Sequence, residues 1–288
     1  MIYIQAIGGL GNQLFTWNMA HHLTVKFGCR IKIVFPKSGT DRRCELFPLK
    51  NECGHRIEVV ESNLLNKFLS LFDRIRKRSE FLGNSIERMF KLRQSDLPSE
   101  IVDFGSTKPF FVRGYFQSPE FVKMNLPIYL DELLRTTQNF ADDSEFFSPR
   151  LLKSQMMHIR RGDFVTNRDT VGLLSLKYFQ EISDNAHELV IFSDSQSDDI
   201  VLGKNFPNSR ILGADVVDTW TGFSLMSFAR ELLVSNSTYS WWAGVISLFR
   251  GGKVIAPEPW TLTNVYGENY LKTENFTLVP ARFEGKEH

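Results

Sequence analysis

Cysteine is scarce in this sequence, and the few cysteines present do not form a recognisable site. The 288 residues include three, Cys29, Cys44 and Cys53. Their number is odd and their spacing matches neither a CxxC motif nor a zinc-ligand set, so a disulfide framework is not indicated. The cysteine pattern therefore predicts a reducing, cytoplasmic environment.

A strong net charge, a long apolar run and a leader peptide are lacking as well. The formal charge of +1 disfavours a basic nucleic-acid-binding protein. No window reaches the ~20 apolar residues of a membrane-spanning helix, and residues 1–5 lack the basic and apolar regions of a secretory signal. We therefore expect a protein that is soluble or peripheral to a membrane, with no nucleic acid as partner.

Nucleotide-cofactor motifs are incomplete, although glycines follow the first predicted strand. Apolar residues over 2–7 and 31–34 predict two strands joined by Gly8-Gly9-Leu10-Gly11-Asn12 and a helix over 13–27. A GxGxxG motif fails because Leu14 stands where the third glycine belongs. No acidic residue ends the second strand, and no Gly-Lys-Ser/Thr triplet is present. Both cofactor interpretations are therefore excluded.

A tight glycine turn remains at this position, with backbone amides at the start of the helix. It would let the side-chain amides of Asn12 and Gln13 reach a cleft. The alternative is that Asn12 only caps the helix. The pattern leaves both interpretations open.

Clustered carboxylates, which a metal ion needs, are also missing. After the predicted strand 189–192, Asp194-Ser195-Gln196 lacks a second acid. Asp198-Asp199 falls at the start of the next helix, and Asp215 and Asp218 are spaced for a helix cap. The sequence predicts no metal site and no resident cofactor, so cationic side chains would have to bind any phosphate.

The apolar content is sufficient for two domains of ordinary size. Hydrophobic residues make up 42% of the chain, with 25 phenylalanines. We expect domains at 1–150 and 151–288, with the polar stretch 138–149 as connector.

A basic stretch lies at 62–93, with eight cationic and three acidic side chains, a local charge of 8 − 3 = +5. Leucine, isoleucine and phenylalanine recur there at helical spacing. A packed helix with a solvated charged face is the simpler interpretation. The sharper one is peripheral contact with anionic lipid headgroups.

Strands and helices alternate clearly in the second half of the chain. The predicted strands are 110–112 before the connector, then 156–159, 189–192, 210–212, 232–234 and 253–256, and the predicted helices are 176–186, 218–229 and 239–249. Such alternation predicts a parallel sheet covered on both faces. Ligands of such sheets bind outside the carboxyl ends of the strands.

Polar clusters follow three of these strands, at His158–Asp163, at Ser193-Asp194 and at Ser235–Ser240. The paired guanidinium groups of Arg160 and Arg161 are suited to a diphosphate. The hydroxyls at the start of a helix form an anion cradle. Asp194 would accept hydrogen bonds from a base with adjacent ring and exocyclic N–H donors, as guanine has.

The third cluster also has a structural interpretation. Asn236 or Ser237 would cap the following helix, and Trp241 and Trp242 are expected in the core. The hydroxyls would serve in both capacities.

Four motifs in order resemble the α-1,2-fucosyltransferases of glycosyltransferase family 11. They are Gly8-Gly9-Leu10-Gly11-Asn12-Gln13-Leu14-Phe15, His158-Ile159-Arg160-Arg161-Gly162-Asp163, Phe192-Ser193-Asp194 and Asn236-Ser237-Thr238-Tyr239-Ser240-Trp241-Trp242. Phe164 and Tyr239 depart from the tyrosine and phenylalanine often found there, without removing chemistry. The resemblance implies an α/β fold of GT-B type, in which two Rossmann-like domains face across a cleft. The N-terminal domain would serve the acceptor, and a last helix would return to it.

The resemblance further implies transfer from GDP-β-L-fucose, with inversion and without metal, to the 2-hydroxyl of a galactosyl acceptor. It places His158 near guanine, Arg160 on the β-phosphate and Asp194 on the base. The same implied donor site includes Arg161, Ser193, Asn236, Ser237, Thr238 and Ser240. The implied acceptor side includes Gly9, Gly11, Asn12 and Gln13.

Asp163 is the nearest motif carboxylate for a general base, or else it orients the neighbouring arginines. A different fucosyl acceptor or linkage, including a lipid-linked core sugar, stays open. So does a non-catalytic nucleotide-sugar-binding module. The expected role is surface-glycan (O-antigen) synthesis in the bacterial cytoplasm, at the inner face of the membrane.

Overall fold

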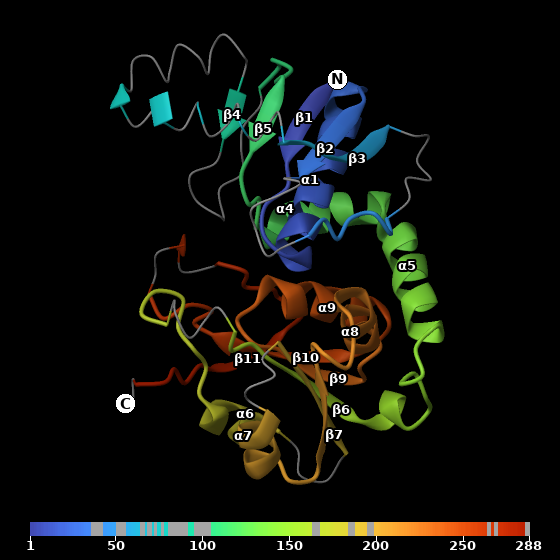
Figure 1. Cartoon of the computed structure of the whole chain (residues 1–288), viewed down its shortest axis with the longest axis vertical. Helices are drawn as coiled ribbons and strands as arrows, with labels where there is room; N and C mark the ends of the chain where they lie inside the picture. Colours follow the sequence, from blue (N-terminus) through green and yellow to red (C-terminus); the bar gives the residue numbers. More distant parts are fainter. Residues whose placement is uncertain are drawn as a thin grey trace. The chain divides into compact units, whose positions relative to one another are not determined.

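The computed structural model forms two compact units, Met1–Leu133 and Leu134–His288 (Figure 1). It describes residues 1–35, 43–49, 56–63, 67, 71, 74–75, 78–79, 92–94, 105–162, 168–183, 188–194, 199–263, 266–267 and 270–285. Each unit is built on one parallel sheet. The α/β class expected for a GT-B chain is therefore confirmed for each unit.

The first unit has a five-stranded sheet in the order β3-β2-β1-β5-β4. Its strands are β1 (Ile2–Gln5), β2 (Ile31–Phe35), β3 (Ile57–Glu61), β4 (Leu92–Gln94) and β5 (Phe111–Arg113). Its helices are α1 (Leu10–Phe27), α4 (Pro119–Asn125), the 3-10 helix η1 (Leu126–Ile128) and the start of α5 (Leu130–Asp142). The strands β1 and β2 are central and bury Ile2, Ile4, Ile31 and Ile33 almost completely.

The second unit has a six-stranded sheet in the order β11-β10-β9-β6-β7-β8. Its strands are β6 (Gln155–Ile159), β7 (Leu189–Ser193), β8 (Ser209–Gly213), β9 (Glu231–Leu233), β10 (Lys253–Glu258) and β11 (Thr277–Pro280). Its helical segments are η2 (Leu151–Lys153), α6 (Leu176–Ile182), α7 (Asp199–Asn205), α8 (Thr219–Ser227) and α9 (Thr238–Phe249). In Figure 1, α8 and α9 cover one face of this sheet and α6 and α7 the other.

Alternation along β6 decides which side chains meet which helix layer. Met157 and Ile159 belong to the apolar cluster that includes Phe179 of α6 and Leu202 of α7. His158, between them, points to the opposite face and meets Tyr239 of α9. The strand therefore contributes one polar side chain to the α8–α9 layer while the other layer stays apolar.

The second unit begins before residue 150, the boundary expected from the sequence. Arg250 Nη2 donates to Leu134 O at 3.1 Å and to Thr137 Oγ1 at 3.0 Å. The Phe140 ring stacks on Trp220 with centroids 5.4 Å apart. These contacts attach the polar stretch after Leu133 to the second unit, and part of the expected connector is the end of α5.

Several predicted bounds are corrected by the structure. Helix α1 begins at Leu10, three residues earlier than expected, and strands β3, β4 and β11 were not predicted. The basic stretch 62–93 lies largely outside the described residues, and its end enters strand β4 rather than a helix. Within the described part of the chain, no α-helix follows β10, and the expected return of a last helix to the N-terminal domain stays a prediction.

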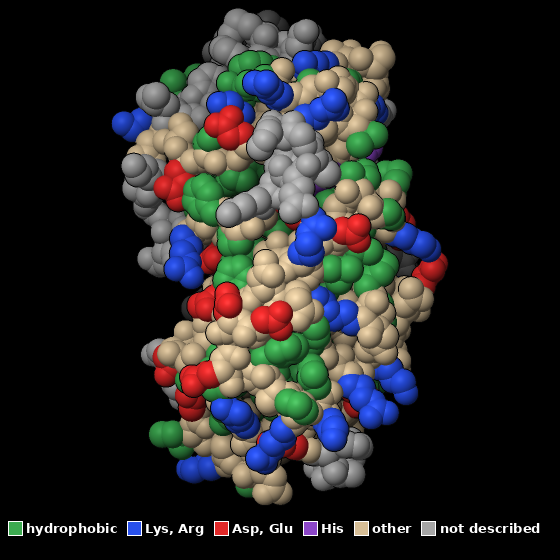
Figure 2. Space-filling model, turned by 90° about the vertical axis from the view of Figure 1, so that its right-hand side faces the viewer, with side chains coloured by type: hydrophobic (Ala, Val, Ile, Leu, Met, Phe, Trp, Pro, Cys, Tyr) green, Lys and Arg blue, Asp and Glu red, His purple; other side chains and the backbone are tan. Residues whose placement is uncertain are grey.

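The described surface carries charges of both signs, in line with the formal net charge of +1. On the face drawn in Figure 2, basic and acidic side chains alternate without one large patch of a single sign. No helix in the described ranges is long and apolar enough to cross a membrane.

Candidate active site

The carboxyl ends of three neighbouring parallel strands carry the predicted polar clusters of the second unit. The chain passes from β6 to β7 and β8 on one side, then returns to place β9 on the other side of β6. This reversal makes the gap between β6 and β9 a topological switch point, where open α/β sheets bind ligands. The segments after β6, β7 and β9 therefore meet at one edge.

Asp194, directly after β7, organises the arginine segment that follows β6. Its Oδ2 lies 2.9 Å from Arg160 Nη1. Its Oδ1 accepts from the backbone N–H of Arg161 at 2.8 Å and of Gly162 at 3.2 Å. A Cβ on Gly162 would overlap the Asp194 carboxylate. Glycine is thus required for this close approach, and Asp194 acts here on the arginine segment. Its expected contact with a base stays a prediction.

The second arginine pairs with a different acid. Arg161 Nη1 lies 2.6 Å from Glu284 Oε1, with side-chain exposures of 16% and 36%. The two adjacent guanidinium groups are therefore each held by a carboxylate from another part of the fold. Such pairing fixes the direction of a long side chain that otherwise samples many rotamers.

His158 is buried between β6 and α9. Its Nδ1 shares a 2.8 Å hydrogen bond with Ser235 Oγ, and its ring centroid lies 5.3 Å from that of Tyr239. Burial, and secondarily the positive charge of Arg160, lowers the pKa of His158 to about 3. The imidazole is consequently neutral at physiological pH, which fits a hydrogen-bonding role better than a charge-pairing one.

The turn into α9 is capped as one of the sequence interpretations predicted. The side chain of Ser237 accepts a hydrogen bond from Tyr239 N. Ser240 is fully buried, and its hydroxyl lies 3.3 Å from the carbonyl oxygens of Ser235 and Ser237. Thr238 is the first residue of α9. The hydroxyls expected near phosphate therefore all lie in this turn, and those of Ser237 and Ser240 make bonds within it.

Asn236 and Ser193 are also buried at this edge. Asn236 Nδ2 donates to the carbonyl oxygens of Val171 and Gly172 at 3.3 and 3.0 Å. It therefore fastens the segment after residue 168 instead of capping α9. Ser193 ends β7 and is 6% exposed. The expected core position of Trp241 and Trp242 is confirmed, since they are 1% and 0% exposed.

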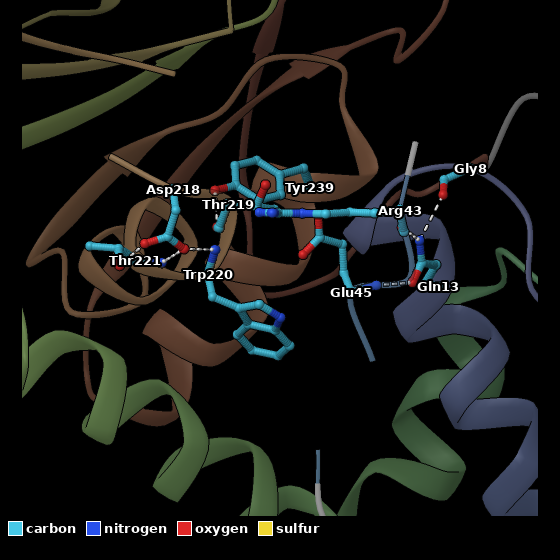
Figure 3. A network of polar contacts seen from close by, with 9 residues as sticks. All are labelled: Gly8, Gln13, Arg43, Glu45, Asp218, Thr219, Trp220, Thr221 and Tyr239. Atoms are coloured by element: carbon cyan, nitrogen blue, oxygen red, sulfur yellow. Dashed lines mark hydrogen bonds and ion pairs between the residues drawn. The ribbon is translucent and has the colours of Figure 1, made fainter. Parts of the chain in front are cut away.

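A second capped helix lies beside this turn (Figure 3). Asp218 Oδ1 accepts from Trp220 N at 2.9 Å and from Thr221 N at 3.1 Å, which confirms the predicted cap of α8. Tyr239 donates its hydroxyl to Thr219 O at 2.7 Å and so joins the starts of α8 and α9. This tyrosine and Ser235 both lie in the predicted cluster Ser235–Ser240, but neither was among the expected donor-site residues.

In the first unit, Gln13 is completely buried and bonds to three backbone groups (Figure 3). Its Nε2 donates to Gly8 O at 2.8 Å and Arg43 O at 3.0 Å, and its Oε1 accepts from Glu45 N at 2.8 Å. The side chain therefore holds the segment at residues 43–45 against the glycine turn. This geometry gives Gln13 a supporting position behind the turn.

Asn12 has a different environment from Gln13. It is half-buried, and its Oδ1 accepts from Gln117 Nε2 at 2.8 Å. Gly9 caps α1 without a side-chain hydrogen bond, so Asn12 is not the cap, and Gly11 is buried in the first turn. Gly8 has φ +76 and faces the Asn12 side chain closely. Sequence reasoning missed Gln117, although it follows β5, the neighbour of β1.

Asn12 and Gln117 occupy the switch point of the first sheet. The chain moves from β1 to β2 and β3 on one side, and places β5 and β4 on the other. The segments after β1 and β5 therefore meet, as those after β6 and β9 do in the second unit. Each unit thus has polar side chains at the switch point of its own sheet.

Two further expectations concern the predicted chemistry. The described residues contain no group of three His, Cys, Asp or Glu side chains placed to hold a metal ion. Asp163, the candidate base, and Phe164 lie outside the described residues.

Comparison with known proteins defines the class of this chain. The model of the family described as glycosyl transferase family 11 matches residues 1–275. The chain therefore belongs to that family and is a glycosyltransferase, as the motifs predicted.

Curated relatives narrow the comparison. The chain is 25% identical over 288 residues to the O-antigen biosynthesis glycosyltransferase WbnK of Escherichia coli, covering 89% of this chain and 94% of the relative. It is 26% identical over 287 residues to an alpha-1,2-colitosyltransferase of Escherichia coli, covering 90% and 92%. Among solved structures, the fucosyltransferase NodZ from Bradyrhizobium aligns with 84% of this chain and 92% of its own at 10% identity, with a TM-score of 0.46.

Proposed function

We propose that this enzyme transfers L-fucose from GDP-β-L-fucose, with inversion, to the 2-hydroxyl of a β-galactosyl acceptor during O-antigen or related surface-glycan synthesis. Family membership supports glycosyl transfer. The relatives named for O-antigen synthesis and for an α-1,2 linkage support the acceptor position and the biological setting. The fucosyl donor rests on the resemblance of the four motifs.

One observation carries the proposal for the donor site. Arg160 and Asp194 meet at 2.9 Å where β6 and β7 end, beside the switch point and the hydroxyl-rich turn into α9. A guanidinium has five N–H donors, so Arg160 is able to hold a carboxylate and a phosphate oxygen at once. The neutral His158 behind it suits hydrogen bonding to an uncharged nucleobase.

The reaction that we propose breaks the bond between the fucose anomeric carbon and the β-phosphate oxygen. The bonding electrons leave with GDP, and Arg160 stabilises the negative charge as it develops, an effect that often dominates catalysis. The acceptor oxygen attacks the opposite face of an oxocarbenium-like sugar, and its proton passes to a base. Asp163 is the proposed base, and orientation of the arginines is its alternative role.

The acceptor would be recognised by the first unit. Asn12 and Gln117 offer amide donors and acceptors at the β1–β5 switch point, which suits sugar hydroxyls. Gly9 and Gly11 would shape the turn, and Gln13 would support it from behind. The proposed acceptors include lipid-linked galactosides. The enzyme would then work at the inner face of the cytoplasmic membrane, with residues 62–93 in contact with the lipid headgroups.

A second donor is favoured by the name of one relative, the colitosyltransferase. Colitose is L-fucose without the 3-hydroxyl, so the phosphate site would serve either donor. Discrimination would depend on a hydrogen bond to that hydroxyl. The same donor site is compatible with two other functions. One is fucosyl transfer to a different acceptor or linkage, and the other is nucleotide-sugar binding without transfer.

The test is a transfer assay with the full chain. GDP-fucose and GDP-colitose are each offered with β-galactosides, α-galactosides and N-acetylglucosaminides, with EDTA or with added Mg²⁺. We expect fucosyl transfer to the 2-hydroxyl of β-galactosides at equal rates under both conditions. Transfer of colitose without transfer of fucose would show that GDP-colitose is the donor. Loss of activity in EDTA would contradict metal independence. GDP binding without any transfer would favour the binding module.

A further inference from the structure

A short segment near the end of the sequence, residues 281–285, crosses the chain that follows β6. We call it the strap. Leu174 and Phe283 form an antiparallel bridge. Ser175 N donates to Arg282 O at 2.8 Å, and Glu284 N donates to Leu173 O at 2.8 Å. Backbone hydrogen bonds therefore fix the register of the strap against residues 173–175.

Side-chain packing fixes the strap as well. Phe283 is 7% exposed and joins the apolar cluster beneath β6 and β7. It lies against Gly172, which has φ +87 and whose Cβ, if present, would overlap the ring. Gly172 O also accepts from Asn236 Nδ2. Residues 172–175 therefore contact both the strap and Asn236, which lies in the turn between β9 and α9.

Two side chains of the strap form ion pairs with residues elsewhere in the second unit. Glu284 Oε1 lies 2.6 Å from Nη1 of Arg161, whose backbone N–H bonds Asp194, the partner of Arg160. Arg282 Nε lies 2.6 Å from Glu181 Oε2 of α6, with side chains 46% and 41% exposed. The pairs have equal lengths and neighbouring positions in the strap, yet only Glu284 pairs with an arginine of the motif.

The family match ends at residue 275, so Glu284 lies beyond it while Arg161 lies within it. We propose that Glu284 is a positioning residue that aims Arg161 at the diphosphate of the donor. This inference rests on the proposed donor site. A guanidinium fixed by one carboxylate loses less rotamer freedom when it binds an anion, so the pair lowers the cost of ordering Arg161.

The experiment is a double-mutant cycle on the full chain, with GDP binding measured by calorimetry and donor kcat and KM by transfer assay. We expect Glu284→Ala to weaken GDP binding by about 3- to 10-fold. Glu284→Gln keeps an acceptor for Arg161 and should retain most of the affinity. In an Arg161→Ala background, Glu284→Ala should have an effect under about 2-fold. Glu181→Gln is the control: it changes the α6 partner of Arg282, the other ion pair of the strap, and should bind GDP like the wild type.

The results separate a positioning role from a structural one. An equal loss from Glu284→Ala with and without Arg161, or an equal loss from Glu181→Gln, would overturn the inference. Normal GDP binding by Glu284→Ala would do the same. If the wild type binds GDP but transfers no sugar, the proposed transfer fails while the cycle still decides on Glu284. If the wild type does not bind GDP, both proposals fail.

Discussion

His158 Nδ1 and Ser235 Oγ lie 2.8 Å apart in the interior of the second unit, where they join the end of β6 to the segment after β9. The pair lies beside the switch point, where β6 and β9 are neighbours, and His158 precedes the arginine segment that begins at Arg160. Because it is buried, it fixes the relative position of two segments whose outer residues are proposed to bind the donor. A neutral imidazole is needed for this arrangement, since a buried charge without a counter-charge is costly.

Stability should depend on pH through His158. Its pKa in the folded chain is about 3, below the usual 6.5, so between these values the unfolded chain binds a proton that the folded chain does not. The free energy of unfolding is therefore highest above pH 6.5, where His158 is neutral in both states. It decreases as the pH falls toward 3, by up to about 1.4 kcal/mol per pH unit. His21, whose pKa burial lowers to about 4, acts in the same direction. Urea unfolding at pH 7 and pH 5 should show a smaller difference for His158→Asn than for the wild type, and equal differences would contradict this assignment.

Gly162 should be intolerant of a side chain. Gly162→Ala would place a Cβ on the Asp194 carboxylate and separate the arginine segment from its acid. We expect at least a ~10-fold lower kcat/KM for the donor, since small displacements of catalytic groups are costly. Gly203→Ala is the matched control, because a Cβ there meets nothing within 4 Å and lies in helix α7, where alanine stabilises by about 0.4–1 kcal/mol. Equal activity of the two variants would disprove the requirement.

Gln13 should contribute to stability through its three backbone partners. Gln13→Ala removes three part-buried hydrogen bonds to the backbone of Gly8, Arg43 and Glu45. Each such bond contributes about 0.5–1.5 kcal/mol to the free energy of unfolding. Gln138→Ala removes an exposed amide that bonds Asp142 at 2.8 Å and should change stability by less than about 0.5 kcal/mol. Chemical denaturation measures both variants. A stable Gln13→Ala protein with impaired acceptor binding would instead favour direct contact with substrate.

Much of the second unit could be predicted because its strands are apolar runs with polar ends. The three clusters, their common edge and the core position of the tryptophan pair all follow from that pattern. Strand β11 was missed because its partial burial gives it no continuous apolar run. The end of helix α5, residues 138–142, was mistaken for the start of a connector. The helix was not predicted, although Leu130, Leu133, Leu134, Thr137 and Ala141 recur at helical spacing.

The partners of individual side chains could not be predicted in the same way. Asp194 bonds Arg160 and two backbone amides, contacts that depend on how β6 and β7 pair and that no local pattern predicts. Glu284 lies 123 residues from Arg161 in sequence, and no local pattern relates them. Sequence reasoning thus identified the edge of the sheet and most of its residues, whereas tertiary packing determines which of them hold the others.

The most direct test of the proposed chemistry is fucosyl transfer by Arg160→Ala, compared with the wild type at saturating acceptor. Asp194 keeps its two backbone donors in this variant, so the melting temperature should change little. If Arg160 stabilises the departing GDP, kcat should fall by roughly 10²- to 10³-fold or more. A folded Arg160→Ala enzyme that transfers fucose at a near-normal rate would contradict this mechanism.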